Sequence, residues 1–109
     1  MGWSTVDENI ELGGKIFLSG FKNLKRDELL IAKKLIGSYA RKFGDGLKNY
    51  ESLNLHLKPV HKTTPDSEKY ELHIKLIHDG KTTNTEVVDH NVFVCIDSAL
   101  KKIEEQVIR

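Results

Sequence analysis

The chain has 109 residues, of which 39% are hydrophobic and 30% charged, which suits one domain with a modest core, whereas two independent domains would each be very small. No apolar run approaches the roughly 20 residues that span a bilayer, and the N-terminus lacks the pattern of a signal peptide, so we expect a cytoplasmic protein with no membrane partner. Cys95 is the only cysteine, which excludes an internal disulfide, and its apolar surroundings predict a buried, inert thiol.

The N-terminal part of the chain predicts a loose arm followed by one strand. Residues 1–9 are mostly polar, so we expect a flexible arm, with residues 10–109 forming the single domain. Between residues 10 and 20, apolar and polar side chains alternate around the pair Gly13-Gly14. This pattern predicts a strand that bends or bulges at the glycines.

A long amphipathic helix is predicted between Lys22 and Lys48. Asn23 can cap its start, near residues 23–25, and the glycines on either side of Asp45 mark its end. At the 100° step of a helix, one broad side is apolar and is expected to join the core. The members of this side are Leu29, Ala32, Leu35, Ile36, Tyr39 and Phe43. The roughly opposite side is basic, with Arg26, Lys33, Lys34 and Arg41.

Three more strands are predicted after this helix. Residues 51–58 alternate leucine with polar side chains, as in a strand with one buried and one solvated face. Residues 59–69 are mainly polar and contain two prolines, so we expect a long exposed connection. The runs 70–76 and 81–88 flank an Asp-Gly pair, a strong hairpin signal, and the second run is weakly apolar, as in an edge strand.

A second amphipathic helix closes the chain, with Asp89 or Asn91 as its cap. Its apolar arc contains Val92, Ile96, Ala99, Leu100, Ile103 and Val107. The order β-α-β-β-β-α predicts an α+β fold, a two-layer sandwich with a four-stranded mixed sheet and two helices on one face. The first strand should run parallel to the second, the remaining strands should form an antiparallel meander, and the other sheet face should be open to solvent.

Positive charge is concentrated in the first helix. The net charge of the chain is only +1, yet residues 21–48 hold eight basic and three acidic residues, a net +5 that the remainder offsets with −4. A basic element on a compensated body is typical of a surface that meets an anionic partner such as a nucleic acid. The alternative is a solvated helix whose lysines bind nothing.

Aromatic side chains give little support to a stacking platform for single-stranded RNA. Tyr39 and Phe43 belong to the apolar side of the first helix, and Phe17 alone is placed to project onto the outer sheet face. Recognition of RNA should therefore run through its phosphates and depend strongly on salt, which favours the helical side of the protein.

The sequence offers little for catalysis or metal binding. Of the five histidines, His56 and His73 are expected to be neighbours on the outer sheet face, but their spacing fixes no third ligand, so we expect no metal. Ser38 has only Lys34 as a plausible base, on a solvent-directed part of the helix. We therefore expect no enzymatic activity, no cofactor and no small-molecule substrate.

The C-terminal half resembles a known family. Residues 69–109 predict a strand, a hairpin, another strand and then a D-x-x-x-[FY]-x-x-I-D-x-A step into the last helix, which is similar to the ribosome hibernation-promoting and ribosome-associated inhibitor family. The step is formed by Asp89, Phe93, Ile96, Asp97 and Ala99. Residues 16–43 fit the same family's strand, glycine-containing turn and first helix, so the resemblance spans roughly residues 16–109. The connection at 59–69 is longer, and the second helix less positive, than is usual in that family.

The resemblance implies a noncatalytic protein that sits on the small ribosomal subunit, in the channel used by messenger and transfer RNA, and inhibits translation under stress. Basic residues on both helices would then contact ribosomal RNA. The expected RNA-binding residues are Lys22, Lys25, Arg26, Lys33, Lys34, Arg41, Lys42, Lys101 and Lys102. The alternative is a protein-interaction or structural domain of the same shape with a solvated basic helix and no role in nucleic-acid binding.

Overall fold

The computed structural model describes residues 9–13, 15–60 and 69–108. The elements in chain order are β1 (Asn9–Gly13), β2 (Ile16–Ser19), the short 3₁₀-helix η1 (Phe21–Asn23), α2 (Arg26–Gly46), β3 (Tyr50–Val60), β4 (Lys69–His78), β5 (Lys81–Asp89) and α3 (Val92–Val107). Nearly all of the expected arm and of the expected exposed connection lies outside the described residues.

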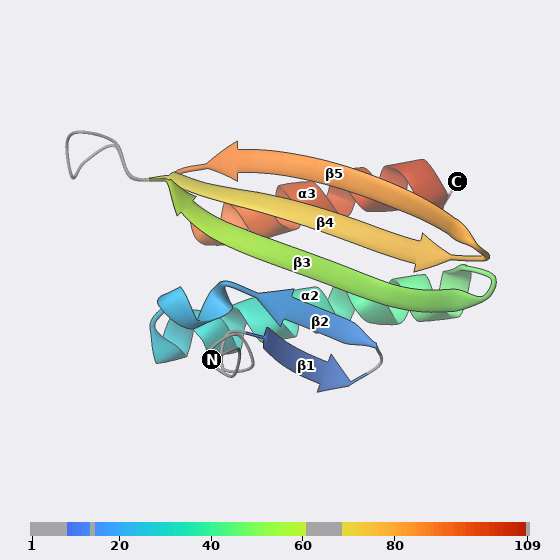
Figure 1. The fold of residues 1–109 in the computed structure, drawn as a ribbon, viewed down its shortest axis with the longest axis horizontal. Coiled ribbons are helices and arrows are strands. Elements are labelled where there is room, and N and C mark those ends of the chain that lie inside the picture. Colours follow the sequence, from blue (N-terminus) through green and yellow to red (C-terminus); the bar gives the residue numbers. More distant parts are fainter. Residues whose placement is uncertain (1–8, 14, 61–68, 109) are drawn as a thin grey trace, which may run out of the picture.

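The strands form one sheet in the order β1-β2-β3-β4-β5, and both helices pack on the same face of it (Figure 1). β2 and β3 are parallel, as expected for strands joined through α2, and every other neighbouring pair is antiparallel. The predicted α+β class, the β-α-β-β-β-α order and the four-stranded mixed sheet are therefore confirmed in β2 to β5 with α2 and α3. The strand β1 adds a fifth member at the edge beside β2.

The stretch from 10 to 20 contains two strands, not the single bent strand that we predicted. A shift of register between Glu11 and Gly13 does fall at the expected place. The chain then reverses, however, because Ile10 pairs with Leu18 in an antiparallel ladder. Lys15 has a φ of 62° in this reversal, a conformation typical of tight turns. The glycines from which we predicted a bend therefore lie where one strand becomes irregular and the chain turns back into the next strand.

The start of α2 also differs from the prediction, because Asn23 is not its cap. Phe21 is fully buried, and the residues from Phe21 to Asn23 form η1, so the α-helix begins only after Lys25. The Glu28 carboxylate accepts a hydrogen bond from the Lys25 backbone N–H at 3.0 Å. A lysine ammonium cannot accept the reciprocal bond, so this interaction is the carboxylate half of a capping box.

The core lies between the sheet and the two helices. Three buried residue pairs join β3 to β4 in register, and each of the six side chains is at most 2% exposed. These pairs are Leu53 with Leu76, Leu55 with Ile74, and Leu57 with Leu72. From α2, Ala32, Ile36 and Phe43 are fully buried against this layer, whereas the predicted core residues Leu29 and Leu35 are only partly buried.

The cap of α3 agrees with one of the two predicted alternatives. The Asn91 Oδ1 accepts hydrogen bonds from the backbone N–H groups of Phe93 and Val94, at 2.8 and 3.1 Å. The Asp89 carboxylate accepts a hydrogen bond from the Asn91 N–H at 3.0 Å and so holds the capping residue in place. An asparagine at this position satisfies two of the backbone donors that a helix start leaves free.

The helices α2 and α3 run parallel and side by side (Figure 1). The Tyr39 hydroxyl donates a hydrogen bond to Asp97 Oδ1 at 2.9 Å, and the Lys42 ammonium lies 3.7 Å from the Glu104 carboxylate. Residue numbers therefore increase together along the two helices. As a result, both helices end at the same end of the molecule.

Gly20, which directly follows β2, lies very close to the backbone of β3, and a substitution can test this close approach. Its φ is 81°, and an added Cβ would lie 2.0 Å from the backbone oxygen of Leu57. Gly20→Ala should therefore cost more than the penalty of about 1–2 kcal/mol for a left-handed residue, because β2 would also have to move away from β3. Urea unfolding of purified protein measures the loss.

Gly80→Ala is the matched control for this substitution. Gly80 has a φ of 72°, and its added Cβ would meet nothing within 4 Å. This variant should lose only the left-handed penalty of about 1–2 kcal/mol. Equal losses in the two variants would contradict the proposed steric role of Gly20.

Candidate nucleic-acid interface

Four cations of α2, here called the basic stripe, lie outside the contact between the helix and the sheet. They are Arg26, Lys33, Lys34 and Arg41. Lys33 is half-buried and the other three are exposed. Since the helix rises 1.5 Å per residue, the stripe from Arg26 to Arg41 is about 22 Å long. The basic side predicted from the sequence is therefore present along most of the helix.

The basic stripe faces outward from the core. Arg26 and Lys33 also face away from α3, whereas Lys34 and Arg41 lie about 80° to 100° around the helix from Lys42. Tyr39 and Lys42 mark the flank of α2 that contacts α3. At 100° per residue, Lys33 lies half a turn from Lys42, and Arg26 lies close to the direction of Lys33. An approaching partner can therefore reach the stripe without displacing the second helix.

The cations of the stripe differ from Lys42 in their electrostatic partners. Among the residues whose side chains the structure describes, no ion pair engages the stripe. Lys42, which we predicted to bind RNA, instead lies beside Glu104 and has its ammonium 5.1 Å from the centroid of the Tyr39 ring. Its charge is partly offset by these contacts, so it is less available to an anionic partner.

The two predicted lysines of α3 are both exposed but point in different directions. Lys101 lies four residues after Asp97 and three before Glu104, so it shares the flank of α3 that contacts α2. Lys102 is turned a further 100° and lies away from that flank. The structure therefore brings Lys101 to the boundary between the helices, with acidic side chains around it, and does not join Lys102 to the basic stripe.

Lys22 and Lys25 lie just before the stripe, in η1 and at the N-cap of α2, and both are exposed. Asp27 and Glu28 follow them in the first turn of the helix. The carboxylates offset much of the positive charge at this end. The net positive region of α2 is therefore centred on its middle, at Lys33 and Lys34.

Two large apolar side chains beside the stripe were missed by our reading of the sequence. Leu30 is 55% and Ile31 is 52% exposed, and Val94, near the start of α3, is 46% exposed. Leu30 and Ile31 fall outside the apolar arc of the same helical wheel that places Ile36 in the core. Their position outside the apolar arc could have identified Leu30 and Ile31 as exposed from the sequence alone. Exposed apolar residues next to cations can add contact area to a binding surface.

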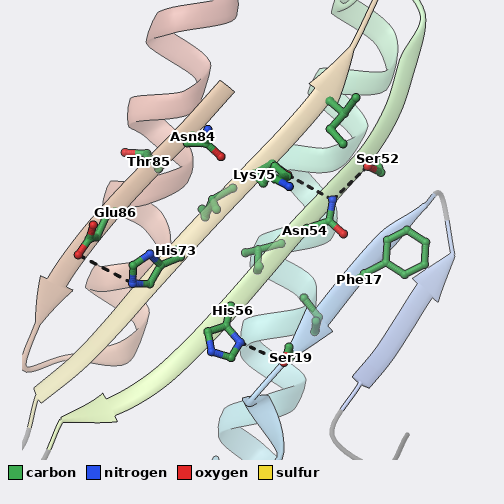
Figure 2. Close-up of a pocket in the computed structure, with 14 residues that line it drawn as sticks. Phe17, Ser19, Ser52, Asn54, His56, His73, Lys75, Asn84, Thr85 and Glu86 are labelled. Atoms are coloured by element: carbon green, nitrogen blue, oxygen red, sulfur yellow. Dashed lines mark hydrogen bonds and ion pairs between the residues drawn. The ribbon is translucent and has the colours of Figure 1, made fainter. Parts of the chain in front are cut away.

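The outer face of the sheet carries a separate, open hollow of about 890 Å³, lined by polar and apolar side chains (Figure 2). Phe17 is 39% exposed on this face, as predicted, beside its register partner Asn54. His56 and His73 are register partners on β3 and β4, which confirms that they are neighbours. The His56 ring, however, is hydrogen-bonded through Nδ1 to Ser19 Oγ at 3.0 Å.

Two carboxylates that the sequence analysis did not consider lie beside His73. His73 Nε2 contacts the Glu71 carboxylate and lies 3.8 Å from Oε2 of Glu86. The hydrogen bond with His73 lowers the pKa of Glu71. The signal for this cluster was the Asp-Gly hairpin, because a two-residue turn pairs His78 with Lys81 and, five residues further along each strand, His73 with Glu86.

The hydrogen bond between Tyr39 and Asp97 joins α2 to α3, and its contribution to stability can be measured. Burial, followed by the hydrogen bond with Asp97, raises the pKa of Tyr39 to about 12. The folded state thus favours the neutral phenol. Its contribution to stability is complete below the unfolded pKa of about 10 and is lost as the pH rises towards 12. Tyr39→Phe should cost about 1 kcal/mol at neutral pH and should lack this part of the alkaline decline.

Urea unfolding between pH 7 and pH 12 would measure both effects. Tyr50→Phe is the control at neutral pH, because the Tyr50 hydroxyl makes a longer, exposed bond of 3.4 Å to the Lys15 carbonyl. This control should cost less at neutral pH. Burial raises the pKa of Tyr50 as well, so this variant is not a control for the alkaline decline. A decline above pH 10 that is the same in the wild type and in Tyr39→Phe would contradict the role assigned to Tyr39.

Cys95 should be unreactive in the folded protein. The side chain is fully buried, and its thiol lies 3.4 Å from the carbonyl oxygen of Val87. Burial, followed by the charge of Asp89, raises the pKa of the Cys95 thiol to about 11. Because the thiolate is the reactive form, an aromatic disulfide reagent at pH 8 should label Cys95 only after unfolding in urea. Rapid labelling of the native protein would contradict the described packing of α3.

No protein-family model matches this sequence, and no curated protein sequence matches it. Within the described part of the chain, neither α2 nor α3 combines the length and the apolar composition needed to cross a membrane. What the protein does therefore has to be inferred from its own side chains and from the sequence resemblance.

Proposed function

We propose that the protein is a noncatalytic RNA-binding protein that binds the small ribosomal subunit and inhibits translation under stress by occupying a site that substrate RNAs need. The observation that carries this proposal is the basic stripe of α2. Its four cations are accessible, lie on one side of one rigid helix, and are not engaged by ion pairs within the described residues. Cations that folding does not use in this way are available for phosphate.

The chemistry of the stripe predicts how such binding should behave. Lysine and arginine contacts to phosphate release counterions, so affinity falls steeply with salt concentration. Four contacts correspond to a salt slope of about −3 to −3.6, or a loss of roughly 50- to 150-fold between 50 and 200 mM salt. The basic stripe extends over about 22 Å of a single helix. This suits a partner whose phosphates are held in a fixed arrangement, as in folded RNA.

The ribosomal part of the proposal is supported by the sequence resemblance over residues 16–109. The strand and helix order of that family agrees with the order from β2 to α3. In such a protein, bound RNA would not be changed chemically, and inhibition would follow from occupancy alone. A cytoplasmic location is part of the same proposal.

A protein-interaction domain is the alternative function, and one observation favours it. Leu30 and Ile31 are more than half exposed beside the stripe. An apolar pair bordered by cations is also a common arrangement at protein interfaces. In that case the lysines would only surround an apolar contact, and binding would depend little on salt.

Co-sedimentation with purified small ribosomal subunits separates the two functions. The test variant carries K33E, K34E and R41E, and the matched control carries K58E, K75E and K81E, three exposed lysines of the sheet layer. We expect wild type and control to co-sediment at 50 mM salt and to dissociate as salt increases. The test variant should lose binding, or retain a salt slope lower by roughly three units.

The RNA-binding proposal fails if the wild type does not bind subunits at low salt, or if the test variant binds as tightly as the control. Loss of binding in a Leu30→Ser, Ile31→Ser variant, with binding retained in the test variant, would instead establish the protein-interaction function. Thermal unfolding of each variant would confirm that it is folded.

A further inference from the structure

Three side chains with metal-ligating atoms meet on the outer face of the sheet, on the layer opposite the basic stripe. Glu71 and His73 are two residues apart on β4, so the pleat directs both to the same face. Glu86 is the register partner of His73 on β5. Figure 2 shows His73 and Glu86 directed towards each other from these neighbouring strands. Strand geometry therefore accounts for the cluster without any distortion of the backbone.

The donor atoms of the three side chains are close enough to share one ion. The relevant nitrogen and oxygens all lie within 4.8 Å of one another, and His73 Nε2 is 3.8 Å from Glu86 Oε2 and in contact with Glu71 Oε2. The side chains are 23% (Glu71), 42% (His73) and 58% (Glu86) exposed. An ion from solvent can thus reach all three.

Two carboxylates held this close together favour a cation as their partner. A divalent cation supplies two positive charges, which match the two carboxylates, and the His73 imidazole nitrogen is a further donor of the kind that such ions bind.

We propose that Glu71, His73 and Glu86 form a binding site for a single zinc ion on the outer sheet face. One imidazole nitrogen and two carboxylate oxygens belong to the donor set that zinc takes in proteins, at about 2.0–2.2 Å from the metal. Small rotations of exposed side chains can bring donors now 3.8 Å apart around such an ion. Three protein ligands leave a fourth position for water or for a ligand in the adjoining hollow. This site does not depend on the function proposed for the basic stripe.

The neighbouring histidine does not belong to the group of donor atoms that lie within 4.8 Å of one another. His56 lies opposite His73 in the β3–β4 register, but its Nδ1 is 3.0 Å from Ser19 Oγ (Figure 2). His56 therefore has the same chemistry and the same sheet face without belonging to the cluster. It provides a matched control for a substitution of His73.

Titration of the full chain with zinc chloride, followed by calorimetry, tests the site. We expect one zinc ion per chain and a rise in the thermal unfolding midpoint when zinc is added. Glu71→Gln, His73→Ala and Glu86→Gln should each weaken binding by at least roughly tenfold. His56→Ala and Glu105→Gln, an exposed carboxylate on α3, should bind zinc as the wild type does.

The outcomes that overturn the proposal are distinct. Zinc binding that is unchanged in His73→Ala, or reduced equally in His56→Ala, would place the ion elsewhere. The absence of any difference between the wild type and the Glu71→Gln, His73→Ala double variant would show that this cluster binds no zinc. Zinc-induced changes in the imidazole proton signals of His73, with those of His56 unaffected, would support the assignment independently of affinity.

Discussion

The single apolar face of the sheet is the constraint on which the rest of the structure depends. Three buried residues of β3 pair in register with three of β4, and all six must be covered on the same side: Leu53, Leu55 and Leu57 with Leu76, Ile74 and Leu72. A one-residue slip between these strands would expose the whole set and bury the histidines instead. Because α2 and α3 cover the apolar face, the helices can present charge only outward, and the opposite sheet face carries polar side chains together with the exposed Phe17.

This division gives the two layers different chemistry. The helical layer carries cations on the outer side of α2, with Leu30 and Ile31 beside them. The sheet layer carries histidine and glutamate side chains that contact one another. The buried core separates the two surfaces, so a change on one should leave the other intact. The surface proposed for an anionic partner and the site proposed for zinc therefore lie on opposite sides of the protein.

Local sequence patterns predicted most of the fold because its strands and helices follow simple periods. The alternating leucines of β3 and the Asn91 cap of α3 needed only nearby residues. The cap of α2 was assigned to Asn23 instead of Lys25, because burial of Phe21 winds the chain into η1 first, which is a tertiary effect. The cluster of Glu71, His73 and Glu86 was missed for a different reason. His73 meets Glu86 through the register of two strands, and the hairpin signal was used to find the turn but not to pair the residues.

The parallel course of α2 and α3 has an electrical consequence. Each helix has a macrodipole, equivalent to roughly half a positive charge at its N-terminus and half a negative charge at its C-terminus, and parallel neighbours add where antiparallel ones would cancel. Asp27 and Glu28 offset the positive pole of α2, and the Asp89 carboxylate, bonded to the Asn91 N–H, lies at the start of α3. The two positive poles lie at one end of the molecule and the two negative poles at the other (Figure 1). Among the described residues, the last turn of neither helix contains a basic side chain, so the two negative poles lie at the same end without a matching charge in those turns.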